Sequence, residues 1–239
     1  MTENEMPPDV NFSQGAWRNA LLIWLLGCVI LGCGCFVAAG RALQAWPSRF
    51  WAAVCWQLSF AVGLSAILAA IVFLQRSRGL SLSSVGWRKP STKTTIAIGI
   101  GLGLLYTLGV YAGILNDPRM KDVNPFDLHW VRFALIPVGV YMAFAEETMM
   151  RGFFMTELSR ARVPTWLQVL LSGVCSGVYH SFQNLTRIGL LPSVILFTLH
   201  AILYIASRRS LTPVIIAHSL YHVLGAPYLL MFAMAQSQR

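Results

Sequence analysis

The feature that most constrains this chain is a series of long apolar runs. A helix needs about 20 apolar residues to cross the hydrocarbon core of a bilayer. Residues 20–40 contain no charged side chain, and residues 50–74 carry Gln57 as their most polar one. Further apolar runs cover residues 95–115, 133–155, 166–180, 190–206 and 212–235. Because a bilayer core offers no water to the backbone, the sequence predicts an all-α, polytopic membrane bundle of seven to eight transmembrane helices.

Composition agrees with a surface that faces lipid. Of the 239 residues, 56% are hydrophobic and only 11% are charged, and the mean hydropathy is +0.61. A soluble domain of this size needs more charge to cover its surface. The net charge of +9 invites a nucleic-acid partner, but the basic residues are spread through short loops, as in the positive-inside bias of membrane proteins. We therefore expect the lipid bilayer as a partner and no nucleic acid.

The chain is interpreted as one domain with a short leading tail. Residues 1–16 are predicted to be disordered, and residues 17–239 to form a single transmembrane domain. The five cysteines lie inside apolar runs without zinc-ribbon spacing, so they are interpreted as small hydrophobic residues. Residues 78–90 mix leucines, a valine and a tryptophan with serines and basic residues, a pattern that suits a short interfacial helix.

Ionisable residues within the apolar runs are confined to the second half of the chain. The first three runs contain no acid, base or histidine. A charged side chain at mid-membrane costs about 2.5–3.5 kcal/mol on insertion scales, so such residues indicate function by default. The ionisable residues in or at the ends of the later runs are Glu146, Glu147, Arg151, His180, His200, His218 and His222.

Two adjacent glutamates head this group. Glu147 and Arg151 are four residues apart with the acid first, which is the better orientation for an ion pair on a helix. Glu146 points about 100° away around the axis and has no local partner. An unpaired carboxylate in a low-dielectric setting is a competent proton acceptor. The alternative is an ion-pair network that only joins helices.

Four histidines follow. His180 ends an apolar run, where a lone histidine is commonly a core residue. His218 and His222 lie one turn apart on one helical face, a spacing that suits zinc ligation and equally two hydrogen-bond donors aimed at an oxyanion. No spacing links His200 to another polar residue, and we interpret it as structural.

These groups suit attack on a carbonyl by an activated water, with a base, an orienting neighbour and donors for the tetrahedral anion. The sequence has no serine nucleophile elbow, no aspartyl pair on separate runs and no His-Glu-x-x-His motif. Those absences argue against the rhomboid, presenilin-like and site-2 metalloprotease classes of intramembrane protease, respectively.

The order of the motifs resembles the CAAX protease and bacteriocin-processing family of intramembrane glutamate proteases, which includes Ras-converting prenyl endopeptidases. The family pattern is Glu-Glu-x-x-x-Arg, Phe-x-x-x-His and His-x-x-x-Asn on three membrane helices. The chain has the first as Glu146 to Arg151, the second as Ser176 to His180 and the third as His218 to His222. Ser176 therefore replaces a phenylalanine, and His222 replaces an asparagine.

The resemblance implies a role for each matching residue. Glu146 would activate water and His180 would help to position it, while His218 and His222 would stabilise the oxyanion. Glu147 and Arg151 would form a supporting ion pair. The catalytic core would then span about residues 131–235, with no cofactor and no metal.

The expected activity is that of an intramembrane endopeptidase. Its substrate would be a membrane-associated peptide or protein, or a prenylated carboxy-terminal peptide. The resemblance favours a bacterial inner membrane. Two alternatives stay open: a catalytically silent membrane protein that binds a partner, such as an immunity or regulatory protein, and a zinc-dependent protease that uses the histidines.

The densest group of basic residues predicts the orientation of the chain. It lies in residues 75–94, so this loop and the amino terminus are expected in the cytosol. A cysteine placed at Ser84 should resist an impermeant thiol reagent in intact cells and react after lysis. Labelling in intact cells would reverse the predicted orientation.

Overall fold

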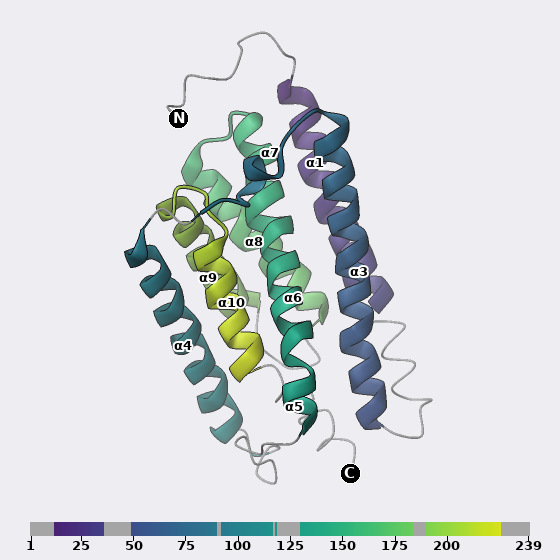
Figure 1. Cartoon of the computed structure of the whole chain (residues 1–239), viewed down its shortest axis with the longest axis vertical. Helices are drawn as coiled ribbons and strands as arrows, with labels where there is room; N and C mark the ends of the chain where they lie inside the picture. The colour runs from purple at the N-terminus through teal and green to yellow at the C-terminus, as the bar shows by residue number, and fades with distance from the viewer. Residues whose placement is uncertain are drawn as a thin grey trace.

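The structure is a computed structural model, and it describes residues 12–35, 49–89, 92–116, 118, 130–183 and 190–225. Within these residues every regular element is helical, and the helices form a bundle with most axes running along its length (Figure 1). The predicted all-α class is therefore confirmed. Helix α1 begins at Phe12, inside the segment predicted to be a tail, while residues 1–11 lie outside the described part.

The helices follow the predicted apolar runs. Helices α5, α6, η4 and α7 make one nearly continuous helical segment, within which η4 is a π-helix. The elements are α1 (Phe12–Gly27), η1 (Cys28–Cys35), α3 (Arg49–Ser77), η2 (Leu82–Val85), α4 (Lys93–Asn116), α5 (Trp130–Ala134), α6 (Ile136–Glu147), η4 (Thr148–Phe154), α7 (Met155–Arg160), α8 (Thr165–Gln183), α9 (Leu190–Ala206) and α10 (Thr212–Leu224).

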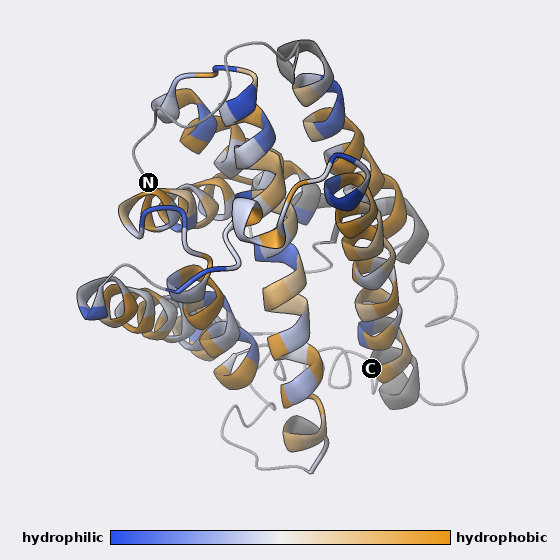
Figure 2. Cartoon of the chain, turned by 45° about the horizontal axis from the view of Figure 1, so that its top comes forward, coloured by the Kyte–Doolittle hydropathy of each residue, from blue (hydrophilic) through white to orange (hydrophobic). Residues whose placement is uncertain are grey.

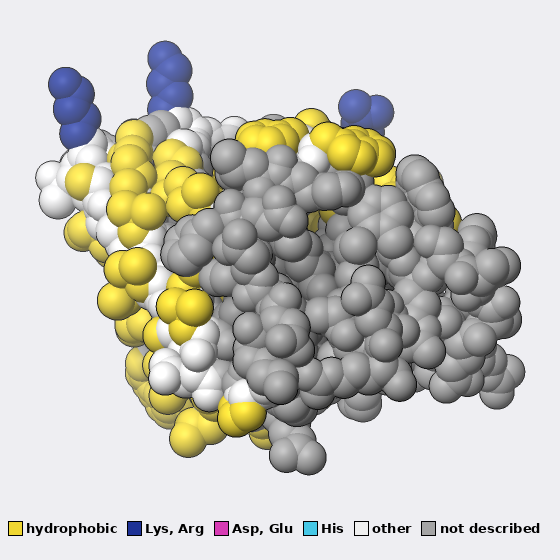
Figure 3. Space-filling model, turned by 90° about the horizontal axis from the view of Figure 1, so that it is seen from below, with side chains coloured by type: hydrophobic (Ala, Val, Ile, Leu, Met, Phe, Trp, Pro, Cys, Tyr) yellow, Lys and Arg dark blue, Asp and Glu magenta, His cyan; other side chains and the backbone are white. Residues whose placement is uncertain are grey.

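Three helices in the described part are long and apolar enough to cross a membrane. These spans are Gly15–Gly32, Gln57–Ser77 and Lys93–Gly113. Large hydrophobic side chains on their outer faces are exposed, including Val62 and Leu105. Hydrophobic residues predominate along the helices, and many of the hydrophilic residues lie at the end of the bundle that is turned toward the viewer in Figure 2. Seen from below, the described side chains on the flank are again largely hydrophobic (Figure 3). The chain is an integral membrane protein.

Helix α10 lies between α4 and α6, and α8 packs on α9 (Figure 1). The third apolar run carries five glycines, and two of them allow a close approach between helices. A Cβ atom at Gly103 would lie 2.6 Å from the carbonyl oxygen of Ala217, and one at Gly99 would collide with Pro213. A Cβ atom at Gly101 would meet nothing within 4 Å, because that position faces outward. Only one side of α4 therefore needs small residues.

The segment between α3 and α4 enters the protein interior. The sequence suggests a surface helix here, but Val85 in η2 is fully buried. The Trp87 indole N–H donates to the Thr148 hydroxyl at 3.1 Å, and its ring lies 5.2 Å from that of Phe144. On the other side, the backbone N–H of Leu211 donates to the Gly86 carbonyl at 3.1 Å. This segment therefore joins the π-helix to the turn before α10.

The buried carboxylate of Glu157, on α7, connects α1 and the end of α3 to α7. Glu157 is fully buried and accepts hydrogen bonds from Asn19 on α1 at 3.2 Å and from Arg78 after α3 at 2.9 Å. Arg160 pairs with the same carboxylate. Because all these partners are polar or cationic, the buried charge of Glu157 is neutralised.

The close contact between α4 and α10 predicts a difference between two neighbouring glycines. Gly103→Val should push α10 away and destabilise the protein by about 1–3 kcal/mol, the usual cost of overpacking. Gly101→Val carries the same helix-propensity change at an open position and serves as the control. Thermal unfolding in detergent should show a lower midpoint for Gly103→Val alone, and equal midpoints would contradict the packing described here.

Candidate active site

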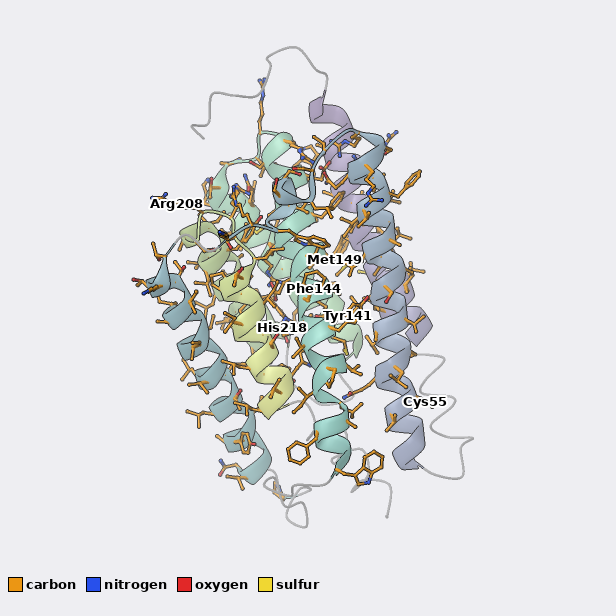
Figure 4. All side chains as sticks on the ribbon, viewed as in Figure 1. Cys55, Tyr141, Phe144, Met149, Arg208 and His218 are labelled. Carbon is orange, nitrogen blue, oxygen red and sulfur yellow. The ribbon has the colours of Figure 1, made fainter. Side chains whose placement is uncertain are left out.

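The structure brings the six predicted site residues into one region of the bundle. Glu146 and Glu147 end α6, and Arg151 follows on the π-helix η4. His180 lies near the end of α8, and α10 carries His218, which points into the bundle in Figure 4, and His222. Three segments that are far apart in sequence, α6 with η4, α8 and α10, therefore meet around two adjacent carboxylates.

Glu147 and Arg151 form the ion pair that their spacing predicts. Arg151 Nε lies 3.3 Å from Glu147 Oε2, and both side chains are buried. Arg151 Nη2 also donates to the carbonyl oxygen of Phe197 on α9 at 2.9 Å, and its guanidinium carbon lies 5.0 Å from the centroid of the Phe197 ring. The cation is therefore held on two sides by groups that stabilise positive charge.

The second oxygen of Glu147 contacts two histidines. His218 Nδ1 lies 2.8 Å from Oε1, and His200 Nδ1 lies 3.0 Å from the same atom. Since an ionised carboxylate only accepts, both Nδ1 atoms carry a proton in this arrangement. Sequence spacing links His200 to no polar partner, because its contact with Glu147 arises from the packing of α9. The one feature of the sequence that could have indicated a role for His200 is its position, as an ionisable residue, within an apolar run.

Glu146 faces a different histidine. His180 Nε2 lies 3.2 Å from Glu146 Oε2, and the Glu146 side chain is nearly fully buried. The other ring nitrogen, Nδ1, lies 2.8 Å from the carbonyl oxygen of Ser176, to which it donates. That bond leaves Nε2 directed at the carboxylate. The Phe197 ring packs on the imidazole of His180 with centroids 4.2 Å apart, so this imidazole is oriented by one ring contact and by the hydrogen bond at Nδ1.

The two α10 histidines stack on one another. His218 Nε2 and His222 Nε2 are 3.2 Å apart, and the ring centroids are 4.9 Å apart. Helix α6 comes close enough to hold His222 because residue 139 is glycine, and a Cβ atom there would lie 2.8 Å from His222 Cβ. With the His218 proton on Nδ1, a neutral His218 accepts at Nε2, and His222 donates to it.

One group of residues in the described part brings donor atoms close enough for a metal ion. Glu147, His200 and His218 each offer an atom within 4.8 Å of the others. Both Nδ1 atoms are directed at the same carboxylate oxygen at hydrogen-bond distance, and the Arg151 cation lies 3.3 Å from the other oxygen. Two N–H donors explain this geometry, and a neighbouring cation opposes a divalent ion. These three residues therefore fit a hydrogen-bonded network better than a metal site.

Comparison with known proteins bears on the same half of the chain. A family model described as Type II CAAX prenyl endopeptidase Rce1-like matches residues 128–224, which run from just before α5 to the end of α10. The matched segment contains all six site residues, and it confirms the family resemblance indicated by the motifs. That family is one of proteases. No curated protein and no solved structure matches the chain.

Proposed function

We propose that this protein is an intramembrane endopeptidase that hydrolyses a peptide bond with a water activated by Glu146. The observation that carries the proposal is that the two glutamates have different partners. Glu147 is engaged by Arg151, His200 and His218, whereas Glu146 faces only His180 among the polar contacts described above. A buried carboxylate without a cation beside it is suited to accept a proton.

The proposed reaction needs two proton transfers. Glu146 takes a proton from water, and the resulting hydroxide attacks the scissile carbonyl carbon to form a tetrahedral anion. The carbon–nitrogen bond then breaks, and the protonated Glu146 returns its proton to the leaving amine. His180, 3.2 Å from Glu146 Oε2, orients the carboxylate and the water.

The His218 and His222 pair is proposed to stabilise the tetrahedral anion. In the described arrangement His222 Nε2 donates to His218 Nε2, and in the proposed reaction this N–H turns to the tetrahedral anion instead. His218 uses Nδ1 for Glu147, so it donates from Nε2 only when both of its nitrogens carry protons. The buried carboxylate of Glu147 balances that positive charge. Donors already aimed at developing charge act strongly in a low-dielectric site.

The family match supports a substrate that is itself held in the membrane. A prenylated carboxy-terminal peptide fits a family of CAAX prenyl endopeptidases, and a peptide precursor or a membrane protein fits the site equally. We place the amino terminus and residues 75–94 in the cytosol on the distribution of basic residues. The family resemblance, and not the charge distribution, favours a bacterial inner membrane.

Substituting each glutamate separately tests the mechanism. Glu146→Gln keeps size and hydrogen bonding but removes the base, so proteolysis should vanish while the unfolding midpoint is retained. Glu147→Gln leaves Arg151 as a buried cation without its carboxylate. The loss of a buried ion-pair partner lowers the free energy of unfolding by about 3–5 kcal/mol, so expression or stability should fall. The measurements are thermal unfolding in detergent and the membrane peptidome of cells that produce each variant.

The same comparison separates the enzyme from a silent partner-binding protein. Peptides present with the intact protein and absent with Glu146→Gln support an endopeptidase. Identical peptidomes would favour the silent binder. A stable but inactive Glu147→Gln protein beside a fully active Glu146→Gln protein would exchange the two roles.

Substituting His222 separates an oxyanion role from zinc ligation. Asparagine supplies an N–H donor but is a poor zinc ligand, so His222→Asn should keep much of the activity. His222→Ala should lose about 10²–10³-fold in kcat, the usual cost of one oxyanion donor. Cleavage of a quenched farnesylated peptide ending in a CAAX sequence, with elemental analysis for zinc, is the measurement. Stoichiometric zinc together with an inactive His222→Asn protein would support the metalloprotease alternative.

A further inference from the structure

Helix α9 contributes to the site although no motif assigns it a role there. Its residue Phe197 stacks on His180 and accepts a hydrogen bond from Arg151, and its residue His200 reaches Glu147. His200 is 2% exposed, so its imidazole is removed from water. Its Nδ1 proton is directed at Glu147 Oε1, and its ring lies edge-on to that of His218, with centroids 5.6 Å apart.

We propose that His200 is a positioning residue that holds the Glu147 carboxylate in the orientation required by His218. The inference rests on the proposed function, because it assigns His218 to oxyanion stabilisation. The geometry that carries it is the shared oxygen: Glu147 Oε1 accepts from His200 at 3.0 Å and from His218 at 2.8 Å, while Oε2 faces Arg151.

A glutamate carboxylate turns about a terminal torsion with broad, weakly defined minima. Arg151 at 3.3 Å holds one oxygen of Glu147, but a single partner does not fix the plane of the group. The His200 N–H, which comes from another helix, supplies a second fixed direction. Once the plane is fixed, Oε1 presents a defined acceptor to His218 Nδ1, and the direction of His218 Nε2 follows.

Loss of the His200 donor therefore acts through His218. His218 would be the only histidine left to donate to Oε1, and the carboxylate would turn toward it or away from it. Either movement displaces His218 Nε2 from the position where the anion develops. A misplacement of about 1 Å in a catalytic group costs up to about 10²-fold in rate. Because His200 itself does not touch the substrate in this scheme, the loss should appear in kcat and not in KM.

Two substitutions separate the N–H donor from simple packing. In His200→Asn the side-chain amide nitrogen occupies the position of Nδ1 and keeps the donor. In His200→Leu the volume is filled but the donor is lost. Leu203 lies on the same helix, is buried, and has no contact with the carboxylates among those described, so Leu203→Ala is a matched control for destabilised packing of α9.

The full chain, purified in detergent, would be assayed with the quenched farnesylated CAAX peptide and by thermal unfolding. We expect His200→Leu to lower kcat about 10–100-fold at an unchanged KM. His200→Asn should stay within about threefold of the parent, and Leu203→Ala should lower the unfolding midpoint without changing kcat. An unchanged kcat in His200→Leu, or a His200→Asn protein as inactive as His200→Leu, would overturn the proposal.

A second measurement does not depend on turnover. In protein labelled with ¹⁵N-histidine, His218 should appear with its proton on Nδ1. His200→Leu should shift the His218 ring-nitrogen resonances, and His200→Asn should leave them in place. Unchanged His218 resonances in His200→Leu would overturn the positioning role even if the peptide is never cleaved. An inactive parent protein with the expected resonance shifts would reject only the proposed activity.

Discussion

The site is organised around one buried negative charge. Glu147 lies where neither lipid nor water compensates it, so the protein must supply every partner of its carboxylate. Arg151 comes from the next turn of the same helical segment, whereas His200 and His218 come from α9 and α10. Each of these helices is thereby fixed in rotation about its axis, because a turn of either would withdraw its imidazole and leave a charge uncompensated. Electrostatics of this kind sets the positions of helices that lipid alone does not hold together.

Close steric packing holds α10 against its neighbouring helices, in addition to the charged contacts. Gly103 lets α10 lie against α4, and Gly139 lets α6 reach His222, so α10 is held from both sides. Phe197 packs on His180 on one side and on the guanidinium of Arg151 on another. The ring therefore contacts one partner of each glutamate, His180 for Glu146 and Arg151 for Glu147. Small residues and one aromatic ring thus pack directly against the groups that surround the two adjacent carboxylates.

Local patterns predicted one part of this arrangement, and the family resemblance predicted another. The apolar runs locate the helices, and the four-residue spacing of Glu147 and Arg151 places both on one helical face. The proximity of Glu146 and His180 was anticipated only through the order of the family motifs, since they lie on different helices. His200 was interpreted as structural because its partner, Glu147, is 53 residues away in sequence. The burial of Val85 could not be predicted from the sequence either. Val85 lies in the segment between α3 and α4, and its burial depends on how that segment packs against η4 and the turn before α10.

The side chains of the site differ in their exposure to solvent, and the imidazoles of His180 and His222 are more exposed than the carboxylates. The His180 side chain is 20% exposed and His222 is half-buried, whereas Glu146 and Glu147 are almost completely enclosed. In the proposed endopeptidase, an incoming carbonyl group would meet the more exposed imidazoles before the enclosed carboxylates. A carbonyl inside a helix is bonded to an amide four residues on and sheathed by side chains to a diameter of about 10–12 Å. A polypeptide cleaved here has to unwind around the cut, so the tendency of its sequence to leave the helical state becomes part of substrate selection.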